Sequence, residues 1–192
     1  MAVAPSRLRS SPITLIEPFP ISVIDTPRLS LREISTADDE FIFILMNEPA
    51  YIQYIGDRGI RTLENSRSYI LEKFIASYAK FGYGLYLVEL KGKQIPVGIC
   101  GFVRRDMLEH PDIGFAFLRE YWSRGLAYEA ASAMLEYGRG PLGLKVVLGI
   151  TPPGNQASIR LLKKLGLRYQ RTIRVPPVDR DSMLFSTEGE KG

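Results

Sequence analysis

The chain has 192 residues, of which 45% are hydrophobic and 24% charged, and Lys plus Arg exceed Asp plus Glu by 25 to 21, giving a net charge of +4. This length fits one domain, and the composition excludes a disordered or collagen-like chain. One cysteine and one histidine exclude an internal disulfide framework and a zinc site of four Cys and His ligands, and so small a charge gives little reason to expect a nucleic-acid partner.

Residues 1–24 are expected to form a flexible N-terminal extension. Prolines stand at positions 5, 12, 18 and 20, and no acidic residue precedes Glu17. An acid-poor, basic leader is typical of organelle-targeting peptides, but the prolines interrupt any amphipathic helix, which favours a solvated extension. A lone cysteine and the lack of an apolar run of about 20 residues predict a cytoplasmic protein with no membrane partner.

One domain is expected over residues 25–187, followed by a tail over residues 188–192. Residues 28–34 alternate between polar and apolar, which predicts a half-buried strand. Ser35 and the acids after it predict a helix start, whose inward stripe we place at Phe41, Ile44 and Leu45. A second helix is predicted over residues 64–80, with one broad apolar face formed by Tyr69, Ile70, Phe74, Ile75 and Tyr78.

The second half of the domain alternates strands and helices. Strands are expected over residues 83–90, 95–103, 112–118, 145–150, 167–173 and 182–186, and helices over residues 126–137 and 155–165. Gly166 suits a left-handed helix cap. This order predicts an α/β fold of the α+β type, in which helices flank both faces of a mixed, mostly antiparallel central sheet with one strand–helix–strand crossover.

The turn before residue 126 is the first candidate site. Gly125 has no Cβ and Ala127 has a minimal side chain, so a ligand can approach the backbone closely there. Unpaired amides and the helix dipole at such a turn suit an anion such as a pyrophosphate, and Arg124 adds a positive charge. Further along, Asn155 is placed to cap the next helix, with Ser158 at the end of its first turn, and each feature alone is also typical of an ordinary helix start.

Together these two stretches resemble the GNAT acyltransferase superfamily, and most closely its branch of ribosomal-protein N-terminal acetyltransferases. The resemblance covers residues 25–187 and is carried by residues 26–32, 112–115, 121–130 and 155–166. It implies a GNAT fold that binds acetyl-CoA as cosubstrate, without a metal. The cofactor-binding positions it implies are Phe115, Ala116, Phe117, Leu118, Arg124, Gly125, Leu126, Ala127, Asn155 and Ser158.

The resemblance also assigns roles to these positions. Residues 124–127 would bind the pyrophosphate through backbone amides, and the strand at 115–118 would diverge from its neighbour and pair with the pantetheine arm, as exposed strand edges can. Asn155 would bind the same arm, and Ser158 would protonate the leaving thiolate. The chain departs from the wider family at Leu162, where that family often has a tyrosine acid. It also has Lys163 and Lys164 where this branch usually has an acidic residue and then lysine, and Leu167 where phenylalanine is usual.

Acyl transfer to an amine needs a neutral amine, a hydrogen-bond donor for the carbonyl oxygen and a proton for the thiolate. For the base we select Asp112, treated as an exposed acid that shares a strand face with Gly114 and Ala116; Glu109 and His110 are alternatives. Trp122 could line the cofactor site or pack the core, and we favour packing. Phe81, Tyr83 and Tyr86 fit an acceptor pocket and the sheet core equally well, whereas Cys100 is expected to be a small buried residue.

The sequence therefore predicts an acetyltransferase that acts by direct attack of a primary amine, either a protein N-terminus or a small molecule. A non-catalytic acyl-CoA-binding or regulatory module is the alternative, which the substitutions at Leu162 and Lys163 keep open, and a protein-interaction domain without cofactor is a second one. The acceptor is not readable from the sequence, because one scaffold serves many functions. The oligomeric state, monomer or homodimer, is equally open.

Overall fold

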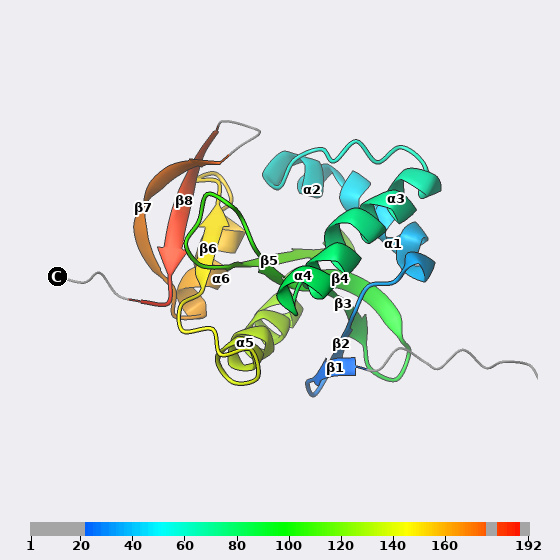
Figure 1. Ribbon diagram of the computed structural model, residues 1–192, viewed down its shortest axis with the longest axis horizontal. Coiled ribbons are helices and arrows are strands. Elements are labelled where there is room, and N and C mark those ends of the chain that lie inside the picture. The colour runs from blue at the N-terminus through cyan, green and yellow to red at the C-terminus, as the bar shows by residue number, and fades with distance from the viewer. Residues whose placement is uncertain (1–21, 176–179, 189–192) are drawn as a thin grey trace, which may run out of the picture.

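The computed structural model describes residues 22–175 and 180–188, so the targeting alternative and most of the expected N-terminal extension lie outside the described residues. One eight-stranded sheet runs through these residues in the order β1-β2-β3-β4-β5-β6-β8-β7 (Figure 1). Its strands are β1 (Ser22–Asp25), β2 (Leu29–Arg32), β3 (Leu85–Leu90), β4 (Ile95–Val103), β5 (Asp112–Phe117), β6 (Leu148–Thr151), β7 (Arg168–Val175) and β8 (Arg180–Ser186). All neighbours pair antiparallel except β5 and β6, which confirms the predicted mixed sheet and its single crossover.

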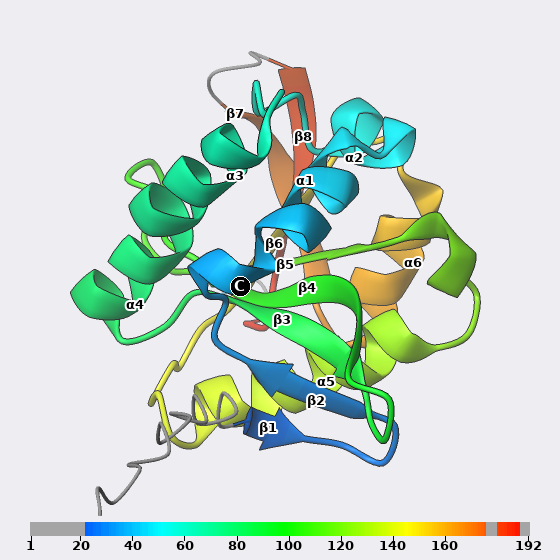
Figure 2. The same cartoon turned by 90° about the vertical axis from the view of Figure 1, so that its right-hand side faces the viewer.

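Helices cover both faces of this sheet, as predicted. The helices are α1 (Asp39–Asn47), α2 (Pro49–Tyr54), α3 (Leu63–Tyr69), α4 (Ala76–Phe81), α5 (Leu126–Arg139) and α6 (Gln156–Lys164), with short 3-10 turns at Thr36–Asp38 and Arg119–Tyr121. Figure 2 shows α1–α4 on one side of β3 and β4 and α5 on the other. Strand β3 serves both layers, because Leu87 packs under α1–α4 while Tyr86 and Val88 pack with α5.

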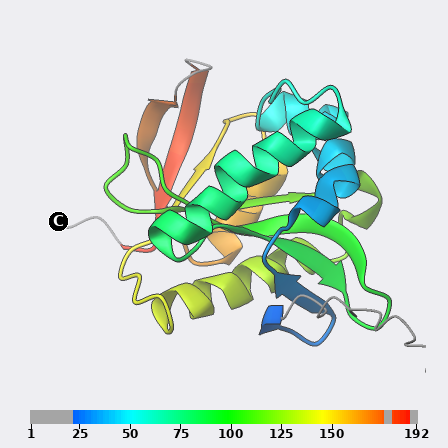
Figure 3. The same ribbon diagram turned by 45° about the vertical axis from the view of Figure 1, so that its right-hand side comes forward.

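The predicted helix over residues 64–80 is a continuous helical run (Figure 3). It contains one π-helical segment, Ile70–Ile75, between α3 and α4. A π turn adds a residue and rotates the following side chains. Ile75, the last residue of this segment, was predicted to face the core but is 36% exposed. The predicted inward position of Ile44 on α1 was also wrong, because this residue is 54% exposed. Ile70 and Phe74 are buried as predicted.

Some elements differ from the expected ones at their ends. Strand β1 begins at Ser22, upstream of the expected domain start, and pairs with β2. Helix α2 was not predicted; Pro49 stands in its first turn, where a missing amide costs nothing. The strand expected from Lys145 starts only at Leu148, although Val146 and Val147 are buried. Gly166 is left-handed, with a φ of +88°, as predicted.

The crossover strands β5 and β6 share a single bridge, Asp112 with Leu148, at which the amide of Leu148 donates to the carbonyl of Pro111 at 2.9 Å. Backbone N–H and C=O groups point alternately to the two sides of a strand. The N–H and C=O groups of Phe115 therefore point toward β6, into the gap between β5 and β6 beyond this bridge. The carbonyl of Phe117 also faces it and accepts from the indole nitrogen of Trp122 at 2.8 Å. The strand edge is therefore open beside β6, as the resemblance implied.

Candidate active site

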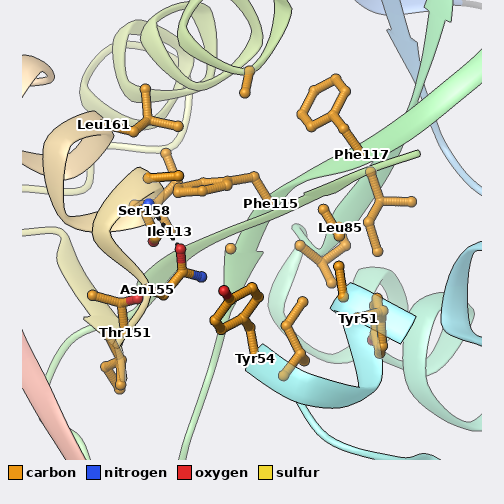
Figure 4. A pocket seen from close by; sticks show the side chains of 18 of the residues that line it. Tyr51, Tyr54, Leu85, Ile113, Phe115, Phe117, Thr151, Asn155, Ser158 and Leu161 are labelled. Atoms are coloured by element: carbon orange, nitrogen blue, oxygen red, sulfur yellow. Dashed lines mark hydrogen bonds between the residues drawn. The ribbon is translucent and has the colours of Figure 1, made fainter. Parts of the chain in front are cut away.

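A cavity of about 720 Å³ occupies this gap and extends to both faces of the sheet. One half is formed by β5, the turn at residues 121–128 and the start of α6. The other half lies under α1 and α2 and includes Tyr51, Tyr54 and Leu85 (Figure 4). A cavity of this size, mainly apolar with a few convergent polar groups, is typical of a small-molecule site.

The turn before α5 has the form that the sequence predicted. Gly125 is the N-cap of α5 with φ +76°, a conformation that favours glycine, and no side chain caps the first amides of the helix. A Cβ on Gly125 would meet only Arg28, at 3.5 Å, so the backbone here is open to a ligand. The first-turn amides and the helix dipole therefore present positive potential to the cavity.

Most of the predicted cofactor-binding residues line this cavity: Phe115, Ala116, Phe117, Gly125, Leu126, Ala127, Asn155 and Ser158. Leu118 and Arg124 do not line it. The guanidinium of Arg124 lies 5.3 Å from the centre of the Tyr121 ring, a cation–π contact that holds the side chain against the turn. Arg124 is thus placed beside the proposed anion site without contributing to its wall.

Glu129, in the first turn of α5, connects the start of this helix to the segment between β1 and β2 by hydrogen bonds. Its carboxylate accepts from the Thr26 hydroxyl at 2.6 Å, from the Arg28 amide at 2.9 Å and from Arg28 Nε at 2.6 Å. Arg28 Nη1 also donates to the carbonyl of Arg124 at 3.0 Å. Desolvation acts to raise the pKa of Glu129, but the bonds from Thr26 and Arg28 outweigh it and leave the pKa below its usual value.

Replacing Glu129 with glutamine should therefore loosen the turn. We expect the free energy of unfolding to fall by about 1–2 kcal/mol, because charge-assisted bonds are lost but Arg28 is half exposed. Urea unfolding measures this loss. Glu136→Gln, an exposed position on the same helix, is the matched control; equal stability of the two variants would contradict this role for Glu129.

The start of α6 forms the opposite wall. The side-chain oxygen of Asn155 accepts from the amide of Ser158 at 3.0 Å, so Asn155 caps the helix as predicted. Figure 4 shows the side chains of Asn155 and Ser158 near Phe115, at the open edge of β5. Leu162 is 1% exposed and packs over Gly149 in the core, so this position contributes packing and no proton donor.

Asp112 lines the cavity but is not the exposed acid that we expected. It is 2% exposed and pairs with Arg105, whose Nε lies 2.8 Å from Asp112 Oδ1. Burial raises the pKa of Asp112, and the neighbouring Arg105 offsets only part of that shift. Glu109 and His110 do not line the cavity. Asp112 is therefore the cavity's buried acid, held by one arginine.

The half of the cavity beneath α1 and α2 contains residues that the sequence analysis missed. Tyr51 is buried, and burial raises its pKa to about 12, so its hydroxyl stays neutral. Tyr54, Tyr69 and Arg58 lie in the same wall. These residues come from α2, α3 and the loop between them, and no local sequence pattern joins them to the crossover strands.

The structure corrects the expectation for Trp122 and decides between the two alternatives left for Phe81, Tyr83 and Tyr86. Trp122 is 42% exposed and lines the cavity, whereas we had favoured core packing. Phe81, Tyr83 and Tyr86 do not line it, and Tyr86 is a core residue at 2% exposed. Cys100 is fully buried as predicted, and burial raises the pKa of its thiol.

Over the described ranges, 22–175 and 180–188, no group of three or more His, Cys, Asp or Glu side chains gathers as a metal site would require. In the same ranges, no helix has the length and apolar character needed to cross a bilayer.

Comparison with known proteins is consistent with this geometry. The chain is 30% identical to the uncharacterized N-acetyltransferase YoaA of Bacillus subtilis over 157 residues, which are 81% of this chain and 87% of that protein. The crystal structure of a GNAT-family acetyltransferase from Bacillus anthracis covers 85% of this chain and 96% of its own, with a TM-score of 0.71 and 25% identity. The structure of RimL, a ribosomal L7/L12 alpha-N-protein acetyltransferase, in complex with coenzyme A shares the fold at a TM-score of 0.75 and 14% identity. The match covers 86% of this chain and 97% of that one.

A family model settles the assignment, because it spans most of the domain. Residues 28–168 match the model described as the acetyltransferase (GNAT) domain. These residues include β2 through α6, and thus the open edge of β5, the turn before α5 and the helix capped by Asn155. The chain is therefore an acyltransferase that belongs to the GNAT acetyltransferase family.

Proposed function

We propose that this chain transfers an acetyl group from acetyl-CoA to a primary amine by direct attack, without a covalent enzyme intermediate. The observation that carries the proposal is a single cavity that joins an open strand edge, at Phe115, to an uncapped helix start, at Gly125. A strand edge can pair with the amides of a pantetheine arm, and helix amides can bind a pyrophosphate. The structural neighbour RimL was solved in complex with coenzyme A, which supports this choice of cosubstrate.

The proposal assigns a role to residues 124–127, Asn155, Ser158 and Asp112. The amides of residues 124–127 bind the pyrophosphate, while Asn155 binds the pantetheine arm. When bound, acetyl-CoA supplies an activated acyl thioester. A new bond between the amine nitrogen and the carbonyl carbon replaces the carbon–sulfur bond; Ser158 gives a proton to the departing sulfur, and Asp112 accepts one from the amine through water.

The acceptor half of the cavity supports an amine substrate. Tyr51 and Tyr54 supply an aromatic wall in which the Tyr51 hydroxyl stays neutral, and Asp112 lines the same cavity. A buried acid whose pKa is raised accepts a proton more readily than an ordinary carboxylate does, because burial disfavours its charged form. Asp112 thus combines the position and the basicity that an amine acceptor requires.

Thermal shift and thiol release test the proposal together. Acetyl-CoA should raise the melting temperature of the protein, and thiol should be released only when a suitable amine from a panel of peptides and small amines is present. Stabilisation by acetyl-CoA without release for any amine would favour the non-catalytic acyl-CoA-binding or regulatory module. Absence of both responses would favour an interaction domain without cofactor.

Ser158→Ala should separate chemistry from binding. We expect kcat to fall by about 100-fold, as for loss of a general acid, while the KM for acetyl-CoA stays within about twofold. Steady-state kinetics give both values. Ser132→Ala, on α5 and outside the cavity, is the matched control. Equal kcat values for the wild type and Ser158→Ala would remove this serine from the reaction.

A further inference from the structure

The hydroxyl of Thr151 has no hydrogen-bond partner although the residue is 2% exposed. Among the described residues, the other buried side-chain atom without a hydrogen bond is Asp39 Oδ2, which is held in an ion pair with Arg67 at 2.6 Å. Thr151 has no such compensation. Because a buried polar group without a partner costs free energy, an orphan hydroxyl of this kind calls for an explanation.

Thr151 ends β6 and lines the cavity. Side chains alternate along a strand, so Thr151 shares a face with Gly149, on which the core side chain of Leu162 packs. This is the face covered by α6. The acid of the acceptor half, Asp112, points to the opposite face with Gly114. Thr151 therefore belongs to the half of the cavity that we assign to the cofactor.

Figure 4 shows the Thr151 oxygen directed into the cavity beside Asn155, on the wall that faces the open edge of β5. Strand β6 has left its ladder with β5 at this level, since their single bridge is at Leu148. A chain laid along the edge of β5 at Phe115 would thus pass between that edge and Thr151. The orphan hydroxyl is placed to contact such a chain.

We propose that the Thr151 hydroxyl is a hydrogen-bond partner of the acyl-pantetheine arm of the cofactor. The arm offers amide N–H groups, amide oxygens and a thioester carbonyl, and a hydroxyl can both donate to and accept from such groups. This inference rests on the proposed function. It makes Thr151 a binding residue that is unsatisfied in the free protein and satisfied in the complex.

Thr151→Val tests the inference, because valine has nearly the same shape but no hydroxyl. Two effects of opposite sign are expected. The melting temperature of the free protein should stay the same or rise, since an unpaired buried hydroxyl is removed, whereas the Kd for CoA should increase by about 5- to 10-fold, the usual value of one neutral hydrogen bond. Thr151→Ser should restore the Kd to within about twofold of the wild type.

Two controls locate the contact. The adenosine bisphosphate fragment of CoA lacks the pantetheine arm, so its Kd should be the same for Thr151→Val and the wild type in calorimetry. Thr187→Val removes a hydroxyl that accepts from the Val147 amide at 3.0 Å outside the cavity. That variant should lower the melting temperature and leave the Kd for CoA unchanged.

The outcomes separate this inference from the proposed function. If the wild type binds CoA and Thr151→Val binds it equally well, the inference is overturned and the proposed function stands. Weaker binding of the adenosine fragment, or a lower melting temperature like that of Thr187→Val, would show a structural role and also overturn it. If the wild type fails to bind CoA, the proposed function fails and the inference falls with it.

Discussion

Gly125→Val is expected to raise the Kd for CoA by about 100-fold or more, because it disrupts the turn that presents the amides at the start of α5. At φ +76° this residue is in the left-handed region, which a β-branched side chain rarely adopts. The expected effect comes from the backbone conformation and not from a steric clash, because the nearest atom to an added Cβ is 3.5 Å away. The variant must rotate its backbone, and the amides at the start of α5 then lose their present orientation toward the cavity.

Isothermal titration with CoA measures the effect, and a matched variant separates it from general destabilisation. Gly143 also has a positive φ, +63°, with no atom near an added Cβ, and it lies outside the cavity. Gly143→Val should lose a similar amount of stability, about 1–2 kcal/mol, while keeping its affinity for CoA. An unchanged Kd in Gly125→Val would show that this turn does not bind the cofactor.

Arg32→Met is expected to destabilise the free protein by about 3–5 kcal/mol, because it leaves two buried carboxylates without their partner. Arg32 is 9% exposed. Its guanidinium donates to both oxygens of Asp38, at 2.7 and 2.9 Å, and to Glu89 at 2.8 Å, and these bonds raise the pKa of Arg32 against the cost of desolvation. The three side chains join β2, β3 and the start of the first helix.

Urea unfolding measures this loss, and compensating changes check its cause. Adding Asp38→Asn and Glu89→Gln to Arg32→Met should recover part of the stability, since the unpaired charges are removed. Arg61→Met, which breaks an exposed pair with Asp57, should leave the unfolding midpoint almost unchanged. A midpoint for Arg32→Met equal to that of the wild type would show that the buried ion network contributes nothing to stability.

Local sequence patterns were sufficient for most of the fold. Alternating residues from Arg28, the cap at Asn155 and the stop at Gly166 act through neighbours within a few positions, so their structures could be predicted from adjacent residues alone. The same applies to Gly125, whose role at a helix start depends on the turn itself. Helix α2 and strand β1 were missed because a short helix and an edge strand carry weak periodic signals.

The sequence by itself thus determined the order of most strands and helices, the family and the two motifs that face the cavity. The tertiary structure decided which other groups meet there. Asp112 looked like an exposed acid until its burial against Arg105 was seen, and Tyr51 approaches the crossover strands only because α2 folds over the sheet. The orphan hydroxyl of Thr151 follows from the divergence of β5 and β6, a relation between strands about 30 residues apart that no local pattern encodes.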